Sequence, residues 1–149
     1  MRKGFTLIEI LIVVGIMAIL AAIVIIAINP GRQFAQARNT QRRSDVVAIL
    51  DAVHQRMVDN EGNFAEGTTC DALPTTVTNI ASTGGVDLCA CLVTDYLAEM
   101  PHDPSATGAS YTDCAAYDTG YTIVKSATSG RITVNAPSYE LGQVISVTR

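Results

Sequence analysis

The chain has 149 residues, of which 48% are hydrophobic and 16% are charged, and its net charge is −4. This length suits one domain with an anchor. Residues 62–149 carry three Lys/Arg and nine Asp/Glu, so the charge of this part gives no reason to expect nucleic-acid binding.

The N-terminal element is a long apolar segment. Phe5 to Ile28 contains 24 residues and only one charge, Glu9. As a helix it would measure about 36 Å, against about 30 Å for the hydrocarbon core of a membrane. Arg2 and Lys3 precede it, which predicts a single-pass precursor in the cytoplasmic membrane with its N-terminus inside and the later residues outside.

The segment differs from a secretory signal peptide. Its apolar stretch is too long, and Asn29-Pro30-Gly31-Arg32 follows it where a small-x-small cleavage site would be expected. The small residue is Gly4, ahead of the apolar stretch. Cleavage after Gly4 would create a new amino group on Phe5 and make Glu9 the fifth residue of a helix beginning there. That amino group could neutralise Glu9 of a neighbouring copy, whereas the simpler alternative is a tolerated glutamate at the membrane interface.

Gly4-Phe5-Thr6-Leu7-Ile8-Glu9, after a short basic leader and before ILIVVGIMAILAAI, resembles the class III signal of type IV pilins and pseudopilins. The resemblance covers roughly residues 1–58. It implies cleavage by prepilin peptidase between Gly4 and Phe5, N-methylation of Phe5, and an assembly contact between Glu9 and the N-terminus of an adjacent identical subunit. The pilus or secretion assembly machinery would be a further partner.

A second helical segment follows. Pro30 and Gly31 predict a break near residues 29–31, later than the proline of familiar pilins. Beyond it, an apolar stripe at helical spacing predicts a face that packs under a sheet; its members are Val46, Ile49, Leu50, Val53 and Met57. The charged residues of this helix, among them Arg42, Asp45 and Arg56, are predicted to lie on its other faces. Turn residues 59–63 end the helix.

Three arginines of this helix, Arg38, Arg42 and Arg43, allow two interpretations. They could form a patch that contacts a membrane surface or DNA. A solvated helix face, or partners for salt bridges between subunits, is the favoured interpretation.

Four cysteines occur, all in the part predicted to lie outside the cytoplasm, with spacing C-x18-C-x-C-x22-C. This spacing does not fit a zinc site, and an even count favours two disulfides. Cys89 and Cys91 are too close together to pair comfortably, so Cys70 and Cys114 each take one of them. Which takes which stays open, and unpaired buried thiols are the alternative.

The remaining residues predict a small antiparallel sheet. Residues 62–92 suggest a connection made mainly of loop with one short helix or strand, and Pro101 and Pro104 force a turn. Alternating residues 121–125 and 131–135 predict a hairpin, and residues 144–148 a third strand. A sheet of three to four strands on the helical stripe gives an α+β fold. YLAEMPHDP resembles the segment before the sheet in major pseudopilins and many Gram-positive-type pilins.

Catalytic and metal sites are not expected. His54 and His102 have no nucleophile or third ligand at a convincing spacing. Some major pseudopilins hold calcium after their Asp-Pro, where this chain has Asp103, Asp113 and Asp118. Calcium prefers about six to eight oxygen ligands, so solvated loop carboxylates are the favoured interpretation and no cofactor is expected.

The predicted organisation is a cleaved leader (1–4), a membrane and assembly helix (5–30), a second helical half (31–61) and an exterior loop-and-sheet region (62–149). The predicted function is that of a structural, non-enzymatic subunit of a type IV pilus-like filament that ends up outside the cell. One alternative is a pseudopilin of a type II secretion or DNA-uptake apparatus. Another is a single-pass anchored protein whose exterior domain binds a ligand.

Overall fold

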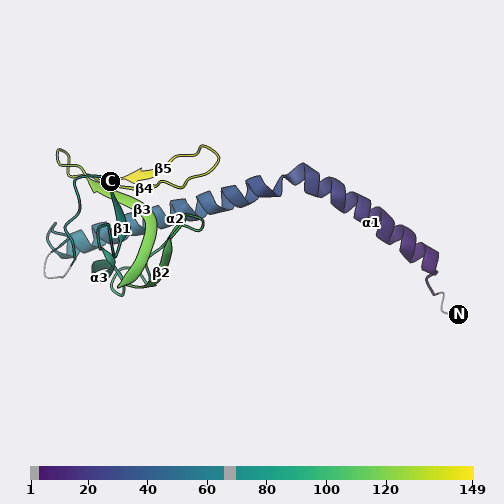
Figure 1. The fold of residues 1–149 in the computed structure, drawn as a ribbon, viewed down its shortest axis with the longest axis horizontal. Coiled ribbons are helices and arrows are strands. Elements are labelled where there is room, and N and C mark those ends of the chain that lie inside the picture. Colours follow the sequence, from purple (N-terminus) through teal and green to yellow (C-terminus); the bar gives the residue numbers. More distant parts are fainter. Residues whose placement is uncertain (1–3, 66–69) are drawn as a thin grey trace. The chain divides into compact units, whose positions relative to one another are not determined.

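The computed structural model describes residues 4–65 and 70–149. The chain divides into two compact units, Met1–Ala35 and Gln36–Arg149. Helix α1 (Leu7–Ile28) belongs to the first unit, and helix α2 (Pro30–Asp59) begins there and continues into the second. The second unit contains the sheet, drawn around the C-terminal part of α2 in Figure 1.

One residue, Asn29, separates the two helices. Its φ of 48° and ψ of 75° are left-handed, which ends α1, and its side-chain Oδ1 accepts a hydrogen bond from the backbone N–H of Arg32 at 3.3 Å. Pro30 then occupies the first position of α2, where its missing N–H costs nothing. The predicted break is confirmed, although Gly31 lies inside α2.

The buried face of α2 forms one side of the core. Val46, Ile49, Leu50 and Val53 are fully buried, and Met57 packs at the edge of the same cluster. Each fully buried aliphatic side chain stabilises the fold by about 1.5–3 kcal/mol relative to exposure. The predicted stripe is therefore confirmed as the surface on which the sheet packs.

The sheet has five antiparallel strands in the order β1-β3-β4-β5, with β2 also paired to β3. Burial alternates along β3, so that Tyr117, Thr119, Tyr121 and Ile123 face the core. The strands are β1 (Thr78–Ala81), β2 (Ser110–Asp113), β3 (Ala116–Lys125), β4 (Ile132–Ala136) and β5 (Ile145–Thr148).

The α+β fold and the predicted hairpin are confirmed, the latter as the pairing of β3 with β4. The sheet is one strand larger than predicted because β3 extends back to Ala116 and there pairs with the short strand β2. Strands of four residues such as β1 and β2 carry little sequence signal, and their pairing with a longer strand determines their conformation.

A buried arginine, Arg42, joins three segments of the second unit. Its guanidinium is fully buried and donates two hydrogen bonds to the carboxylate of Asp103, from Nε at 2.7 Å and from Nη2 at 3.0 Å. Nη1 also donates to Glu140 Oε2 and Asn39 Oδ1, both at 2.9 Å, and Nη2 to Ser105 Oγ at 2.7 Å. The interpretation of Arg42 as part of a solvated or ligand-contacting face is wrong, since it is an internal ion-pair partner.

Two other charged residues of α2 assigned to outer faces are also buried. Asp45 is 6% exposed and accepts hydrogen bonds from Tyr121 Oη at 2.8 Å and Gln41 Nε2 at 2.7 Å. Arg56 is 6% exposed and donates from Nε to the carbonyl of Phe64 at 2.8 Å. In both cases hydrogen bonds within the chain replace those lost to water, which permits the burial.

Asp103 organises the predicted proline turn. Its Oδ1 accepts hydrogen bonds from the backbone N–H groups of Ser105 and Ala106, both at 2.8 Å, and its own N–H donates to the carbonyl of Thr119 on β3 at 2.8 Å. Burial raises the pKa of Asp103, but the hydrogen bonds from Arg42 and from these backbone groups outweigh it and hold the pKa below its usual value.

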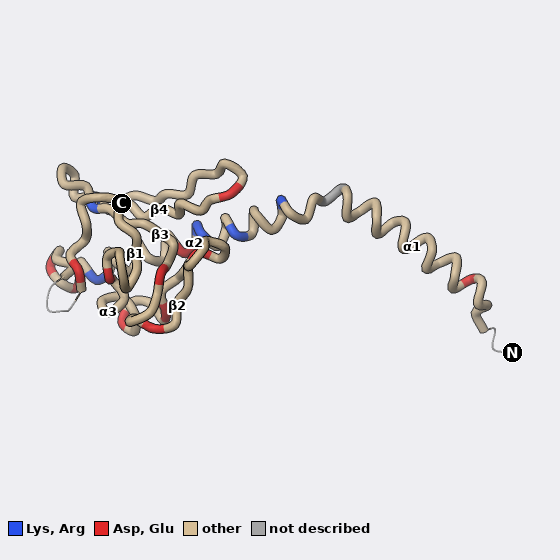
Figure 2. The backbone as a smooth tube through the Cα atoms, in the orientation of Figure 1, with Lys and Arg blue, Asp and Glu red and all other residues tan. Residues whose placement is uncertain are grey.

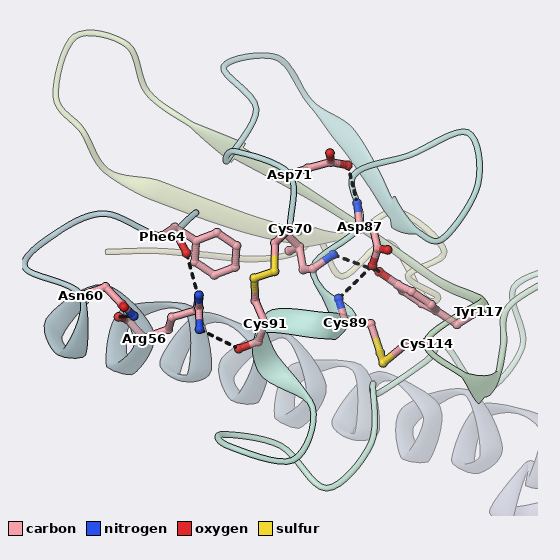
Figure 3. The surroundings of a disulfide bond; sticks show 11 residues. Arg56, Asn60, Phe64, Cys70, Asp71, Asp87, Cys89, Cys91, Cys114 and Tyr117 are labelled. Carbon is pink, nitrogen blue, oxygen red and sulfur yellow. Dashed lines mark hydrogen bonds between the residues drawn. A yellow bond between two sulfur atoms is a disulfide. The ribbon is translucent and has the colours of Figure 1, made fainter. Parts of the chain in front are cut away.

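Both disulfides involve the short helix α3 (Cys89–Leu92). Cys91 pairs with Cys70 across a Cα–Cα distance of 6.0 Å, and Cys89 pairs with Cys114 across 5.3 Å. Figure 3 shows the Cys91 side chain turned toward Cys70 and the Cys89 side chain toward Cys114. The structure thus selects one of the two pairings that the spacing left open, and it joins α3 to the loop before β1 and to the β2–β3 turn.

We expect the Asp103→Asn substitution to destabilise the protein by about 3 kcal/mol, because it leaves the buried Arg42 guanidinium without its bidentate partner. Thermal unfolding of the oxidised full chain in detergent measures the loss. Glu99→Gln, at an exposed position, is the control and should change little. Equal stability of the two variants would show that the ion pair does not hold the fold.

A second prediction concerns pH. Hydrogen bonds from Arg38 and then from Arg42 lower the pKa of Glu140 from 4.5 to about 2. A carboxylate whose pKa is lower in the folded state stabilises it above the unfolded pKa, and this stabilisation is lost as pH falls through the folded value. The melting temperature should therefore fall between about pH 4.5 and about pH 2, and less steeply in Glu140→Gln. Burial raises the pKa of Asp45, so this group changes the stability in the opposite direction as pH falls. Its contribution is the same in the wild type and in Glu140→Gln. Equal pH slopes of the melting temperature in these two proteins would therefore contradict the role of Glu140.

Candidate functional site

The predicted cleavage site lies in extended chain ahead of α1. Residues 4–6 are outside any helix, Phe5 is 79% exposed, and Thr6 has extended torsion angles of −81° and 150°. No side chain of the described residues packs against Gly4. The Gly4–Phe5 bond is therefore open to an enzyme in this structure. The leader charges Arg2 and Lys3 lie outside the described residues.

Thr6 determines where α1 begins. Its Oγ1 accepts a hydrogen bond from the backbone N–H of Glu9 at 3.3 Å, which makes Thr6 the N-cap and Leu7 the first helical residue. The expectation of a helix beginning at Phe5 was therefore two residues early. The signal that reveals this start is the Thr-x-x-Glu pattern of Thr6 and Glu9, typical of a capping box.

Glu9 is the third residue of α1, in its first turn and exposed. A carboxylate there interacts favourably with the unpaired N–H groups and the positive end of the helix dipole. Within residues 4–65 and 70–149, Glu9 forms no ion pair. Its charge is thus stabilised locally by the helix end and is available to a cation from outside the chain.

The rest of α1 is apolar on every face. Leu7–Ile26 has a mean hydropathy of 3.1 and none of it is buried within the chain; in the part of the chain that the structure describes, it is the one helix long and apolar enough to cross a membrane. A helix that is hydrophobic all round requires lipid or other helices around it. Near its start lies an open, mostly apolar groove of about 650 Å³, lined by Phe5, Thr6, Leu7, Ile10, Leu11 and Val14.

The three carboxylates weighed as calcium ligands have separate roles. Asp103 pairs with Arg42. Asp113 Oδ1 accepts from the N–H groups of Ala115 and Ala116 at 2.8 and 3.0 Å, and Asp118 Oδ1 accepts from Asn79 Nδ2 at 2.9 Å. Among the described residues, no three His, Cys, Asp or Glu side chains are grouped so as to hold a metal ion.

The two histidines also lie apart. His54 Nδ1 is 2.8 Å from the carbonyl of Leu50, one turn earlier on α2, which makes Nδ1 the protonated nitrogen. His102 is exposed and borders a cavity of about 220 Å³ together with Asp45 and Glu99.

The comparisons with known proteins concern the N-terminus. The family model of the prokaryotic N-terminal methylation motif matches residues 1–28. No curated protein and no solved structure matches the chain. The matched residues include the predicted cleavage site, Glu9 and all of α1, and the motif and the apolar helix occur together. The chain therefore carries a type IV pilin-like class III signal at its N-terminus.

Proposed function

We propose that the chain is a structural subunit of a type IV pilus-like filament. Prepilin peptidase cleaves it between Gly4 and Phe5, Phe5 is N-methylated, and the subunit polymerises through α1. The observation that supports this most is the methylation motif on a helix whose residues Leu7–Ile26 are all unburied in the part of the chain that the structure describes. Proteins with this motif are structural and not enzymatic.

Glu9 is proposed to pair with a second copy because its unpaired negative charge is costly in lipid. An unpaired charged side chain costs about 2.5–3.5 kcal/mol at the centre of a bilayer and less near an interface. Cleavage creates an ammonium on Phe5, four residues before Glu9 in the sequence and in the segment just ahead of α1. A parallel copy displaced toward its own C-terminus by the axial distance between these two residues brings its Phe5 ammonium beside Glu9. The pair neutralises the charge only in this register, so it orients and positions the incoming subunit.

A pseudopilin of a secretion or DNA-uptake apparatus is the second candidate. The segment YLAEMPHDP resembles a segment of major pseudopilins and of many Gram-positive-type pilins, so it suits either candidate, and its Asp103 organises the turn before β2. The chemistry of the N-terminus is the same for both candidates. Imaging whole cells with antibodies against the exterior domain distinguishes them, because a pilin gives long surface filaments and a pseudopilin does not.

Intact-mass analysis of the purified protein should show loss of MRKG and gain of one methyl group. The physical reason for the cleavage is that Gly4, Phe5 and Thr6 are exposed and lie outside any helix. A strain without prepilin peptidase provides the unprocessed control. An uncut N-terminus in a strain with active peptidase would contradict the proposal and favour a plain membrane anchor.

Glu9→Gln should leave the subunit processed and stable in the membrane but should lower the filament yield at least about tenfold, which corresponds to a loss of about 1.4 kcal/mol per contact. The amide has the same shape and cannot form the ion pair with the Phe5 ammonium. The amounts of processed protein in the membrane and in sheared filaments measure the two effects separately. Normal filaments from this variant would rule out the pairing.

A further inference from the structure

The outer face of α2 carries a groove of about 540 Å³ near its C-terminal end, which we call the acidic groove. Its walls include Asp51, Val58 and Asp59 of α2, together with Asp95 and Tyr96 from the segment after α3. At 100° per residue, these α2 positions point away from the buried stripe that contains Leu50 and Val53. The sheet therefore leaves this face of the helix uncovered.

The groove combines negative charge with apolar surface. Of its three carboxylates, Asp51 pairs with Arg149, whereas Asp59 and Asp95 have no ion-pair partner among the described residues. Asp59 Oδ2 accepts a hydrogen bond from Tyr96 Oη at 2.8 Å, which fixes the tyrosine ring at the wall. Val58 is 79% exposed.

An arginine side chain matches this lining. Its methylene groups pack on apolar surface and on an aromatic ring, and its guanidinium binds carboxylates with two or more hydrogen bonds. A lysine would supply the charge without the planar stacking. The chemistry of the groove therefore favours an arginine presented by a protein surface.

The chain itself presents such an arginine. Arg43 of α2 is exposed, and its guanidinium donates one hydrogen bond to the neutral Gln143 Oε1 at 2.9 Å. The ion pairs within the described residues use Arg38, Arg42 and Arg149, and not Arg43. Figure 2 shows basic positions along the N-terminal part of α2, and both acidic and basic positions near its C-terminal end. Among the described residues outside these ion pairs, Arg43 thus supplies a positive charge before Asp45 and Asp59 a negative charge at the C-terminal end of α2.

We propose that the acidic groove of one subunit binds Arg43 of a second copy of this chain. This inference rests on the proposed function and extends it to the part of the subunit outside the membrane. Asp51 and Asp59 lie eight and sixteen residues beyond Arg43, so the contact requires parallel copies displaced by roughly 12–24 Å, less the reach of the side chains. The copy that supplies the cation is displaced toward its own C-terminus, as in the pairing of Phe5 with Glu9. Each contact therefore pairs a residue of one copy with a residue that lies later in the sequence of the other copy.

Charge reversal tests the contact in full-length protein expressed in cells. Arg43→Glu should lower the yield of sheared filaments at least about tenfold, with unchanged amounts of processed, disulfide-bonded subunit in the membrane. The matched control is Arg131→Glu, which makes the same charge change at an exposed position between β3 and β4. Reversal of the groove, Asp59→Lys with Asp95→Lys, should cause a similar loss. Combining it with Arg43→Glu should restore filaments to within about threefold of wild type.

Each outcome bears on the proposal. Filament yield in Arg43→Glu equal to that in Arg131→Glu would overturn it. A loss that the groove reversal fails to restore would show that Arg43 binds another surface or another protein, which also overturns it. Failure of the proposed function looks different, because wild-type protein would then remain uncut or form no filaments before any variant is compared.

Discussion

The ion pair between Arg42 and Asp103 is the interaction on which the arrangement of the second unit depends. A guanidinium removed from water is costly unless its donors are satisfied, and effective penalties reach several kcal/mol per ion. Arg42 meets this requirement only when the proline turn supplies Asp103 and the β4–β5 loop supplies Glu140. Three segments distant in sequence are thereby coupled, since displacing any one leaves a charge exposed to apolar surroundings. The apolar core holds the sheet on α2, and this network determines where along α2 it lies.

The described side chains of α1 have no comparable contacts within the described part of the chain. Every described side chain of α1 is exposed, so its apolar faces can be buried only by lipid or by other helices. Its one carboxylate lies where a helix end partly satisfies it. The chain thus combines a domain that buries its own apolar core with a helix whose apolar surface must be buried by lipid or by other helices. The proposed move of the chain from a membrane into a filament is compatible with this combination, because only the surroundings of α1 would have to change.

The sequence predicted those features whose signal is contiguous or periodic. The leader, Gly4 and Glu9 form one unbroken motif, and the stripe from Val46 to Met57 repeats at helical spacing. The burial of Arg42 was also encoded, because Arg42, Val46, Ile49 and Val53 follow one helical face. It was missed because a charged residue was assigned to solvent by type and not by position. The acidic groove could not be predicted, since Asp95 and Tyr96 reach Asp59 only through the folding of α3 and the loop after it.

The choice of disulfide partners likewise depended on a local structure with little sequence signal. Residues two apart on a helix point in widely different directions, so the single turn of α3 sends Cys89 toward Cys114 and Cys91 toward Cys70. A four-residue helix has no stability of its own, and α3 therefore depends on its cross-links and packing. Disulfides form in oxidising compartments and not in the cytosol. If the second unit is exported as proposed, its two disulfides distinguish an exported chain from one still in the cytosol, where α3, next to the acidic groove, lacks its cross-links.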